Sequence, residues 1–139
     1  MDKINIGIVV AEFNYDITMM MLQRAREYAE FLGVNVSRVF RVPGTFDMPL
    51  AIKKLLKLDD VDGVVTLGAV IKGETDHHRV IMDNAARKIT DLSLEFEKPV
   101  ALGISGSGES RLQAEARIEM AKDAVESCVK MIKSLRDLK

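Results

Sequence analysis

The sequence predicts an α/β fold in which helices cover both faces of a four-stranded parallel sheet, as a three-layer sandwich. Apolar runs alternate with amphipathic helical segments four times along the 139 residues. The first run, residues 4–13, is nearly continuous and β-branched, as in a strand that is buried on both faces. No internal repeat or linker divides the chain, so we expect a single domain over residues 1–139.

The first strand is followed by apolar residues at helical spacing over residues 17–32, which predicts a helix. Asn14 and Asp16 are both candidates for its N-cap, and Gly33 is placed to end it. These signals define the first strand–helix unit.

The second strand and helix are less regular. Residues 34–40 alternate with one less apolar side, which favours a position nearer the edge of the sheet. Residues 43–44, Pro-Gly, predict a turn. A short helix follows to about Lys57, with Asp47 as a cap and Pro49 in its first turn.

The second half of the chain repeats the pattern. We expect a strand over Gly63–Ile71, a helix over residues 76–96, a strand over residues 98–105 and a last helix over residues 110–138. The apolar residues of the last helix alternate spacings of four and three. This seam favours packing against the sheet over a dedicated interface.

Composition argues against several classes of partner. Twenty basic and 21 acidic residues give a net charge of −1, so we expect neither nucleic acid nor an anionic membrane as a partner. The single cysteine, Cys128, excludes an intrachain disulfide framework and favours a reducing compartment. The sequence shows no signal peptide and no run of about 18 apolar residues. These observations predict a cytoplasmic protein.

The four strand-to-helix connections are the places to look for a site, because ligands of such sheets bind outside the carboxyl ends of the strands. The connections supply an aromatic ring, a carboxylate, histidines, and glycines with hydroxyls. We expect them to form four walls of one pocket. They are EFNYD (residues 12–16), VPGTFD (42–47), KGETDHH (72–78) and SGSGES (105–110).

The two histidines of the chain, His77 and His78, stand side by side at the expected start of the third helix. Histidine titrates near neutral pH, which suits proton transfer, although a surface histidine is usually inert. A metal site is less favoured, because adjacent helical residues point about 100° apart and no HExxH or CxxC pattern adds ligands.

Residues 72–75, Lys-Gly-Glu-Thr, precede the same helix, and helix-start amides next to a glycine can bind phosphate. The alternative is an ordinary turn. SGSGES offers the same chemistry, and neither segment is a GxxxxGK[ST] loop or a GxGxxG turn. Arg117 flanks the apolar seam and is either a solvated residue or an anion ligand. Phe13 is either a ligand-binding residue or an ordinary core residue. Asp47 is either a ligand-binding residue or only a helix cap.

Six segments of the chain together resemble a known family. They are AEFN, VPGTFDMPLA, GAVIKGETDHH, NAARKI, KPVALGIS and QAEARIEMAKDA, in this order over nearly the whole chain. Each motif is weak alone, but their collinear order closely resembles the lumazine synthase family (6,7-dimethyl-8-ribityllumazine synthase) in its short archaeal-like form. The resemblance implies a flavodoxin-like topology.

The resemblance also implies an activity. The family consists of transferases of riboflavin biosynthesis. They condense 5-amino-6-(D-ribitylamino)uracil with 3,4-dihydroxy-2-butanone 4-phosphate to give the lumazine, phosphate and water. No metal or redox cofactor takes part.

The resemblance implies roles for residues of three connections. The pocket residues that it points to are Phe13, Thr45, Phe46, Asp47, Val70 and Ile71. Phe13 would stack on the pyrimidine ring. The backbone around Thr45 and Phe46, with the Asp47 carboxylate, would hold the ribityl chain.

The third connection would bind the substrate phosphate and supply the proton-transfer residue. Gly73, Glu74 and Thr75 would present amides to the substrate phosphate. His77 matches the family's proton-transfer histidine. His78 falls where the family varies, so no essential role is assigned to it.

Two residues would serve a neighbouring subunit in a homo-oligomer built from pentamers. Arg117 matches the arginine that pairs with the phosphate, and Leu102 stands where many relatives have an aromatic residue. The segment between Arg117 and Lys122 is shorter than the corresponding stretch of bacterial members of the family, so the resemblance implies no role for Lys122. A pentamer and a larger icosahedral shell both stay open.

Three other classes of protein compare with this sequence, and two stay open as alternatives: a related archaeal riboflavin synthase and a flavin- or lumazine-binding protein without catalysis. An archaeal riboflavin synthase related to the family is not expected to keep GETDHH. A receiver or flavin-carrier module lacks its acidic pocket or hydroxyl-rich loop here. A lumazine- or flavin-binding protein without catalysis would keep the same pocket.

Overall fold

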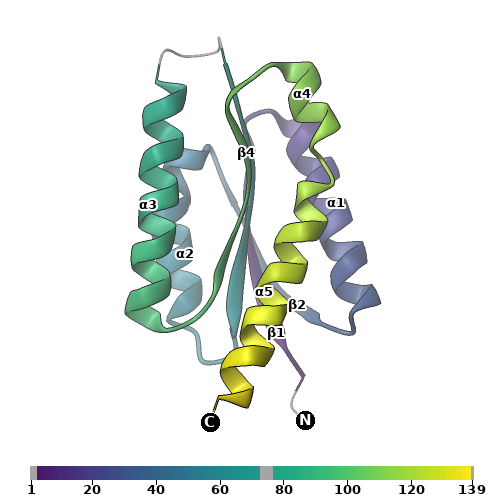
Figure 1. Ribbon diagram of the computed structural model, residues 1–139, viewed down its shortest axis with the longest axis vertical. Coiled ribbons are helices and arrows are strands. Elements are labelled where there is room, and N and C mark those ends of the chain that lie inside the picture. The colour runs from purple at the N-terminus through teal and green to yellow at the C-terminus, as the bar shows by residue number, and fades with distance from the viewer. Residues whose placement is uncertain (1–2, 73–76, 139) are drawn as a thin grey trace.

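A computed structural model describes residues 3–72 and 77–138 of the chain. Four strands form one parallel sheet in the order β2-β1-β3-β4 (Figure 1). The predicted α/β fold and its flavodoxin-like topology are confirmed. The elements are β1 (Asn5–Ala11), α1 (Tyr15–Phe31), β2 (Asn35–Val42), a short 3₁₀ helix (Thr45–Asp47), α2 (Met48–Leu56), β3 (Gly63–Ile71), α3 (His78–Phe96), β4 (Val100–Glu109), α4 (Arg111–Ala116) and α5 (Met120–Asp137).

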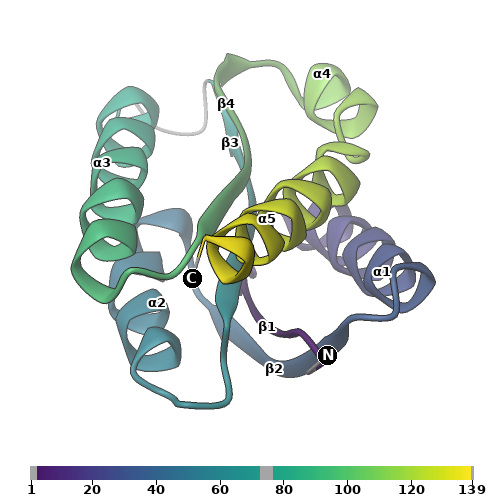
Figure 2. The same cartoon turned by 60° about the horizontal axis from the view of Figure 1, so that its bottom comes forward.

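Helices cover both faces of the sheet. Helices α1 and α5 pack on one face, and α2 and α3 pack on the other (Figure 2). Side chains of a strand point alternately to opposite faces, so a strand between two helical layers is buried on both faces and mostly apolar. Strand β3 is buried along its whole length for this reason.

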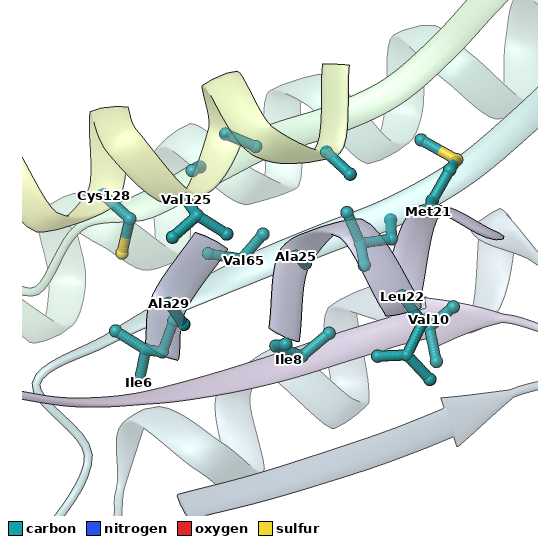
Figure 3. Close-up of a cluster of buried hydrophobic side chains, with 14 of the residues drawn as sticks. Ile6, Ile8, Val10, Met21, Leu22, Ala25, Ala29, Val65, Val125 and Cys128 are labelled. Atoms are coloured by element: carbon teal, nitrogen blue, oxygen red, sulfur yellow. The ribbon is translucent and has the colours of Figure 1, made fainter. Parts of the chain in front are cut away.

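Strand β1 shows the same alternation. Ile6, Ile8 and Val10 point toward α1 and α5, where they meet a cluster that includes Ala25 (Figure 3). Val9 belongs to the cluster under α2 and α3. The continuous apolar run in the sequence therefore reflects two separate cores.

The edge position expected for the second strand is confirmed. Strand β2 pairs only with β1 among the described strands, and most of its residues are exposed or half-buried. Gly33 adopts a φ of 73° just after α1, a left-handed conformation that glycine adopts without steric cost. The expected stop of the first helix is thus also confirmed.

The prediction of one last helix over residues 110–138 is wrong. Helix α4 ends at Ala116 and α5 begins at Met120. Between them, the amides of Arg117 and Met120 donate to carbonyls three residues back, which tightens the chain into turns. The apolar spacing continues through these turns, so the seam in the sequence did not reveal the break.

The expected end of the fourth strand at residue 105 is also wrong. Strand β4 runs on to Glu109, which pairs with Ile71 of β3 across an irregularity in the register. The Lys72 amide then donates to the Glu109 carbonyl at 2.8 Å. Most of SGSGES is therefore strand and not a connection.

Within residues 3–72 and 77–138, no helix has the length and apolar character to cross a membrane.

The third helix begins at His78 in the described part of the chain, and the expected first residue, Asp76, lies outside the described residues.

Cys128 lies in the core between α5 and the sheet, and burial raises the pKa of its thiol to about 12. In the unfolded chain the pKa returns to its ordinary value of about 8.5, so only the unfolded thiol ionises at mildly alkaline pH. We expect the native protein at pH 8.5 to react with a thiol-specific reagent at least about a hundredfold more slowly than the protein in denaturant. Stopped-flow absorbance measures both rates, and comparable rates would contradict the burial of Cys128.

Candidate active site

A cavity of about 310 Å³ opens at the carboxyl edge of the sheet, beside the point where the chain switches from the β1–β2 side to β3. Its described lining comes from the ends of β1 and β3, the loop after β2, and one residue of α3. The lining residues are Ala11, Phe13, Pro43, Gly44, Thr45, Phe46, Ala69, Val70, Ile71 and Ile81. Five of the predicted substrate residues thus meet around one apolar cavity.

Two phenylalanine rings flank the cavity. Phe13 is 59% exposed and Phe46 is 61% exposed, which is unusual for so apolar a side chain. The Phe13 amide donates to the Pro43 carbonyl at 3.0 Å, which ties the end of β1 to the loop after β2. An exposed pair of rings on a fixed backbone is suited to a flat, aromatic ligand.

Thr45 reaches the sheet because β3 carries Gly68 at that point. A Cβ on Gly68 would lie 3.0 Å from the Thr45 hydroxyl and 3.2 Å from the Met48 methyl group. The glycine therefore allows the loop after β2 to approach β3 closely, and Thr45 is buried.

Asp47 is not the side-chain cap that the sequence suggested. It occupies the N-cap position of α2, but its carboxylate accepts from the Gly44 amide at 3.0 Å, in the turn before it. This bond holds the loop that carries Thr45 and Phe46. A carboxylate has further lone pairs, so Asp47 can also accept from a ligand hydroxyl.

Asn14 has a role beyond the helix cap that the sequence predicted for it. It occupies the N-cap position of α1 without a side-chain capping bond, and its φ of 62° is left-handed. Its amide instead donates to the Ala69 carbonyl at 2.9 Å. Asn14 therefore joins the ends of β1 and β3, next to Phe13. Its tolerance for left-handed geometry was the signal in the sequence.

The expectation of four walls around one pocket is wrong for the fourth connection. In the described part of the chain, residues 105–110 contribute nothing to the cavity lining, because β4 continues past its expected end. Leu102 of β4, which was expected to serve a neighbouring subunit, is 44% exposed. It lies in a shallow groove with Met120 and Ala124 and does not line the cavity of its own chain.

The histidines stand at the start of α3, as expected. His77 is exposed and precedes the first helical residue, and its carbonyl accepts from the amide of Ile81, a cavity residue, at 2.9 Å. His77 is thus one turn from the cavity. His78 is half-buried, and its Nδ1 has no hydrogen-bond partner among the described residues. The predicted phosphate ligands Gly73, Glu74 and Thr75 lie outside the described residues.

Arg117 lies away from the cavity, at the corner between α4 and α5. Its Nη1 is 3.1 Å from a carboxylate oxygen of Glu109, whose side chain is fully buried. The other carboxylate oxygen of Glu109 accepts from the Ser105 hydroxyl at 2.8 Å. Glu109 was not predicted as a site residue, because SGSGES reads as a loop in the sequence, where a carboxylate would be solvated.

Among the described residues, no group of three or more His, Cys, Asp or Glu side chains is arranged to hold a metal ion.

Comparison with known proteins assigns the chain to a family. Residues 3–136 match the model of the 6,7-dimethyl-8-ribityllumazine synthase family. The chain belongs to this family. The resemblance that the sequence motifs predicted is confirmed.

Individual lumazine synthases agree along nearly their whole length. The protein of that name from Picrophilus torridus is 80% identical over 96% of this chain and 98% of its own. The lumazine synthase from Methanococcus vannielii is 61% identical over 98% of this chain and 97% of its own. The one from Methanothermobacter thermautotrophicus is 58% identical over 99% of both chains. The similarity to each of these three proteins therefore extends over nearly the whole chain.

The bond from Asn14 to Ala69 can be tested by two substitutions. We expect Asn14→Ala to lower the free energy of unfolding by about 2 kcal/mol, since it removes the bond and places alanine in a left-handed conformation. Asn14→Gly also removes the bond and raises the entropy of the unfolded chain, but it adopts the left-handed conformation without strain, so it should cost less than Asn14→Ala. Urea unfolding at one fixed protein concentration measures both. Equal losses would contradict the contribution of the left-handed backbone.

Proposed function

We propose that this chain is a lumazine synthase, a transferase of riboflavin biosynthesis. It condenses 5-amino-6-(D-ribitylamino)uracil with 3,4-dihydroxy-2-butanone 4-phosphate to 6,7-dimethyl-8-ribityllumazine, with release of phosphate and water. The observation that carries the proposal is the apolar cavity between Phe13 and Phe46, at the switch point of a chain that belongs to this family. Both substrates are small molecules of the size that such a cavity holds.

The pyrimidine substrate occupies the cavity. Phe13 stacks on its ring, and Val70 and Ile71 line the apolar wall. The backbone of Thr45 and Phe46 and the Asp47 carboxylate bind the hydroxyls of the ribityl chain. The bond from the Gly44 amide to Asp47 supports this role, because it fixes the carboxylate beside the cavity before the ligand arrives.

The second substrate binds toward the start of α3. Gly73, Glu74 and Thr75 present their amides to the phosphate, as at other helix starts. His77 transfers protons during Schiff-base formation, phosphate elimination and ring closure. Its place one turn from Ile81 supports this assignment. Holding two reactive substrates together supplies further acceleration.

The site is completed by a neighbouring subunit in a homo-oligomer, with the pentamer as its basic unit. Arg117 pairs with the phosphate and Leu102 packs near the ring of the neighbour's site. Both residues are partly exposed and neither lines the cavity of its own chain, which supports this division. Each subunit is then one domain over residues 1–139, and the cytoplasmic location stays a prediction.

One assay separates this function from its alternatives. The protein is incubated with the ribitylaminouracil and the butanone phosphate, and lumazine absorbance and phosphate release are followed together. We expect both products in equal amounts, above the spontaneous reaction. Binding of lumazine without turnover would identify a non-catalytic binding protein. Conversion of added lumazine to riboflavin would identify a riboflavin synthase.

The roles of the two histidines can be separated by matched variants. We expect His77→Ala to lower the turnover number about a hundredfold, because proton transfer is lost while substrate proximity remains. His78→Ala should stay within about threefold of the parent rate. Steady-state kinetics on both variants measures this difference. A large loss in His78→Ala with none in His77→Ala would reverse the assignment.

Shared sites predict that two defective variants complement each other. His77→Ala and Arg117→Ala subunits are unfolded together, refolded as mixed oligomers, and assayed. About a quarter of the sites should then combine an intact His77 with a neighbour's intact Arg117, so the mixture is faster than the mean of its parents. Parents that are refolded separately and then combined are the control. A rate equal to the mean would place both residues in the site of one subunit.

A further inference from the structure

Glu109 stands out among the buried residues at the end of the sheet. Glu109 is the charged residue among the buried polar residues of the described part of the chain. The others are Thr18, Thr45, Thr66 and Ser105. A buried carboxylate loses its hydration, and this loss must be offset by close partners. The partners of Glu109 therefore indicate what the residue is for.

Both carboxylate oxygens of Glu109 are engaged. One is 3.1 Å from Arg117 Nη1, and the other accepts from the Ser105 hydroxyl at 2.8 Å. The backbone carbonyl of Glu109 accepts from the Lys72 amide at 2.8 Å. The backbone of Glu109 is thus tied to the residue that follows β3, and its carboxylate is held by Ser105 of its own strand. The half-exposed arginine is attached to this fixed carboxylate.

The attachment leaves most of the guanidinium group available for another anion. Arginine carries five N–H donors, and the contact with Glu109 is made through Nη1. The Arg117 side chain is 46% exposed, whereas that of Glu109 has no exposed surface. An anion approaching from outside therefore meets the arginine and not the carboxylate.

We propose that Glu109 is a positioning residue, which holds the Arg117 guanidinium in place for the substrate phosphate of the adjoining site. This inference rests on the proposed function, in which Arg117 is the phosphate ligand. An arginine that is already held loses less rotational freedom when phosphate binds. Ser105 acts one step further back, since its hydroxyl orients the carboxylate.

Kinetic constants for the two substrates separate positioning from a general structural effect. We expect Glu109→Ala to raise the KM for the butanone phosphate roughly tenfold and to leave the KM for the ribitylaminouracil within about twofold. Glu109→Gln keeps a neutral acceptor for Arg117 and should raise the first KM only about threefold. Inhibition by inorganic phosphate should weaken in the same order. Glu115→Gln, on the exposed face of α4, is the matched control.

A double-mutant cycle tests whether Glu109 acts through Arg117. In the Arg117→Ala background, neither Glu109→Ala nor Glu109→Gln should change the KM for the butanone phosphate by more than about twofold. If Glu109→Ala does not assemble, Glu109→Gln carries the same comparison. A Glu109 effect that persists in the Arg117→Ala background, or that falls equally on both substrates, would overturn the inference.

The outcome for Arg117→Ala alone distinguishes the two levels of the proposal. If that variant uses the phosphate substrate normally, the phosphate role of Arg117 is wrong and the inference falls with it. If Arg117→Ala is impaired and both Glu109 variants are not, only the positioning role of Glu109 is overturned.

Discussion

The parallel pairing of β1 with β3 is the constraint on which the site depends. Ile6–Val10 of β1 pair in register with residues 63–67 of β3, and both strands are covered by helices on two faces. Such strands hold few polar side chains along their length, and the polar side chain of β3, Thr66, donates to the Ala101 carbonyl at 2.9 Å. Functional groups are therefore displaced to the carboxyl edge, where the chain leaves the sheet and the cavity opens.

Three hydrogen bonds then give this edge its shape. Asn14 joins the end of β1 to Ala69, Phe13 is joined through its amide to the loop after β2, and Lys72 donates to Glu109. Each bond connects segments that are far apart in the sequence. A cavity wall built from loops needs such connections, since loops have no ladder of their own to hold them. The aromatic rings are therefore presented by a fixed backbone.

The main elements could be predicted from the sequence because their signals are local. Burial on both faces makes β3 a continuous apolar run, and its bounds of Gly63–Ile71 were predicted without error. The break before α5 could not be predicted, because Ala114, Ile118 and Ala121 keep helical spacing across it. The spacing of apolar residues indicates which face of a helix is buried, but it does not indicate that one turn is tightened and the helix interrupted.

The site shows the same boundary between local and tertiary information. The rule for parallel sheets was sufficient to bring the first two strand-to-helix connections together, and the family resemblance named Phe13 and Phe46 within them. The bonds of Asn14 and Glu109 depend on the pairing of β1, β3 and β4, and that register is not written in any single segment. Polar residues that act through tertiary contacts are thus the ones that sequence reasoning passes over.

Separation of the apolar cavity from the charged corner has a physical reason. A flat ring gains most from a cavity that excludes water, whereas a buried charge loses its hydration there. In this chain the Glu109–Arg117 pair lies outside the cavity lining, and only its carboxylate is buried. The guanidinium of Arg117 stays half-exposed and keeps contact with solvent, which offsets part of the cost of burying its partner. The fold thereby keeps its apolar cavity and its buried charge at separate places on the same edge of the sheet.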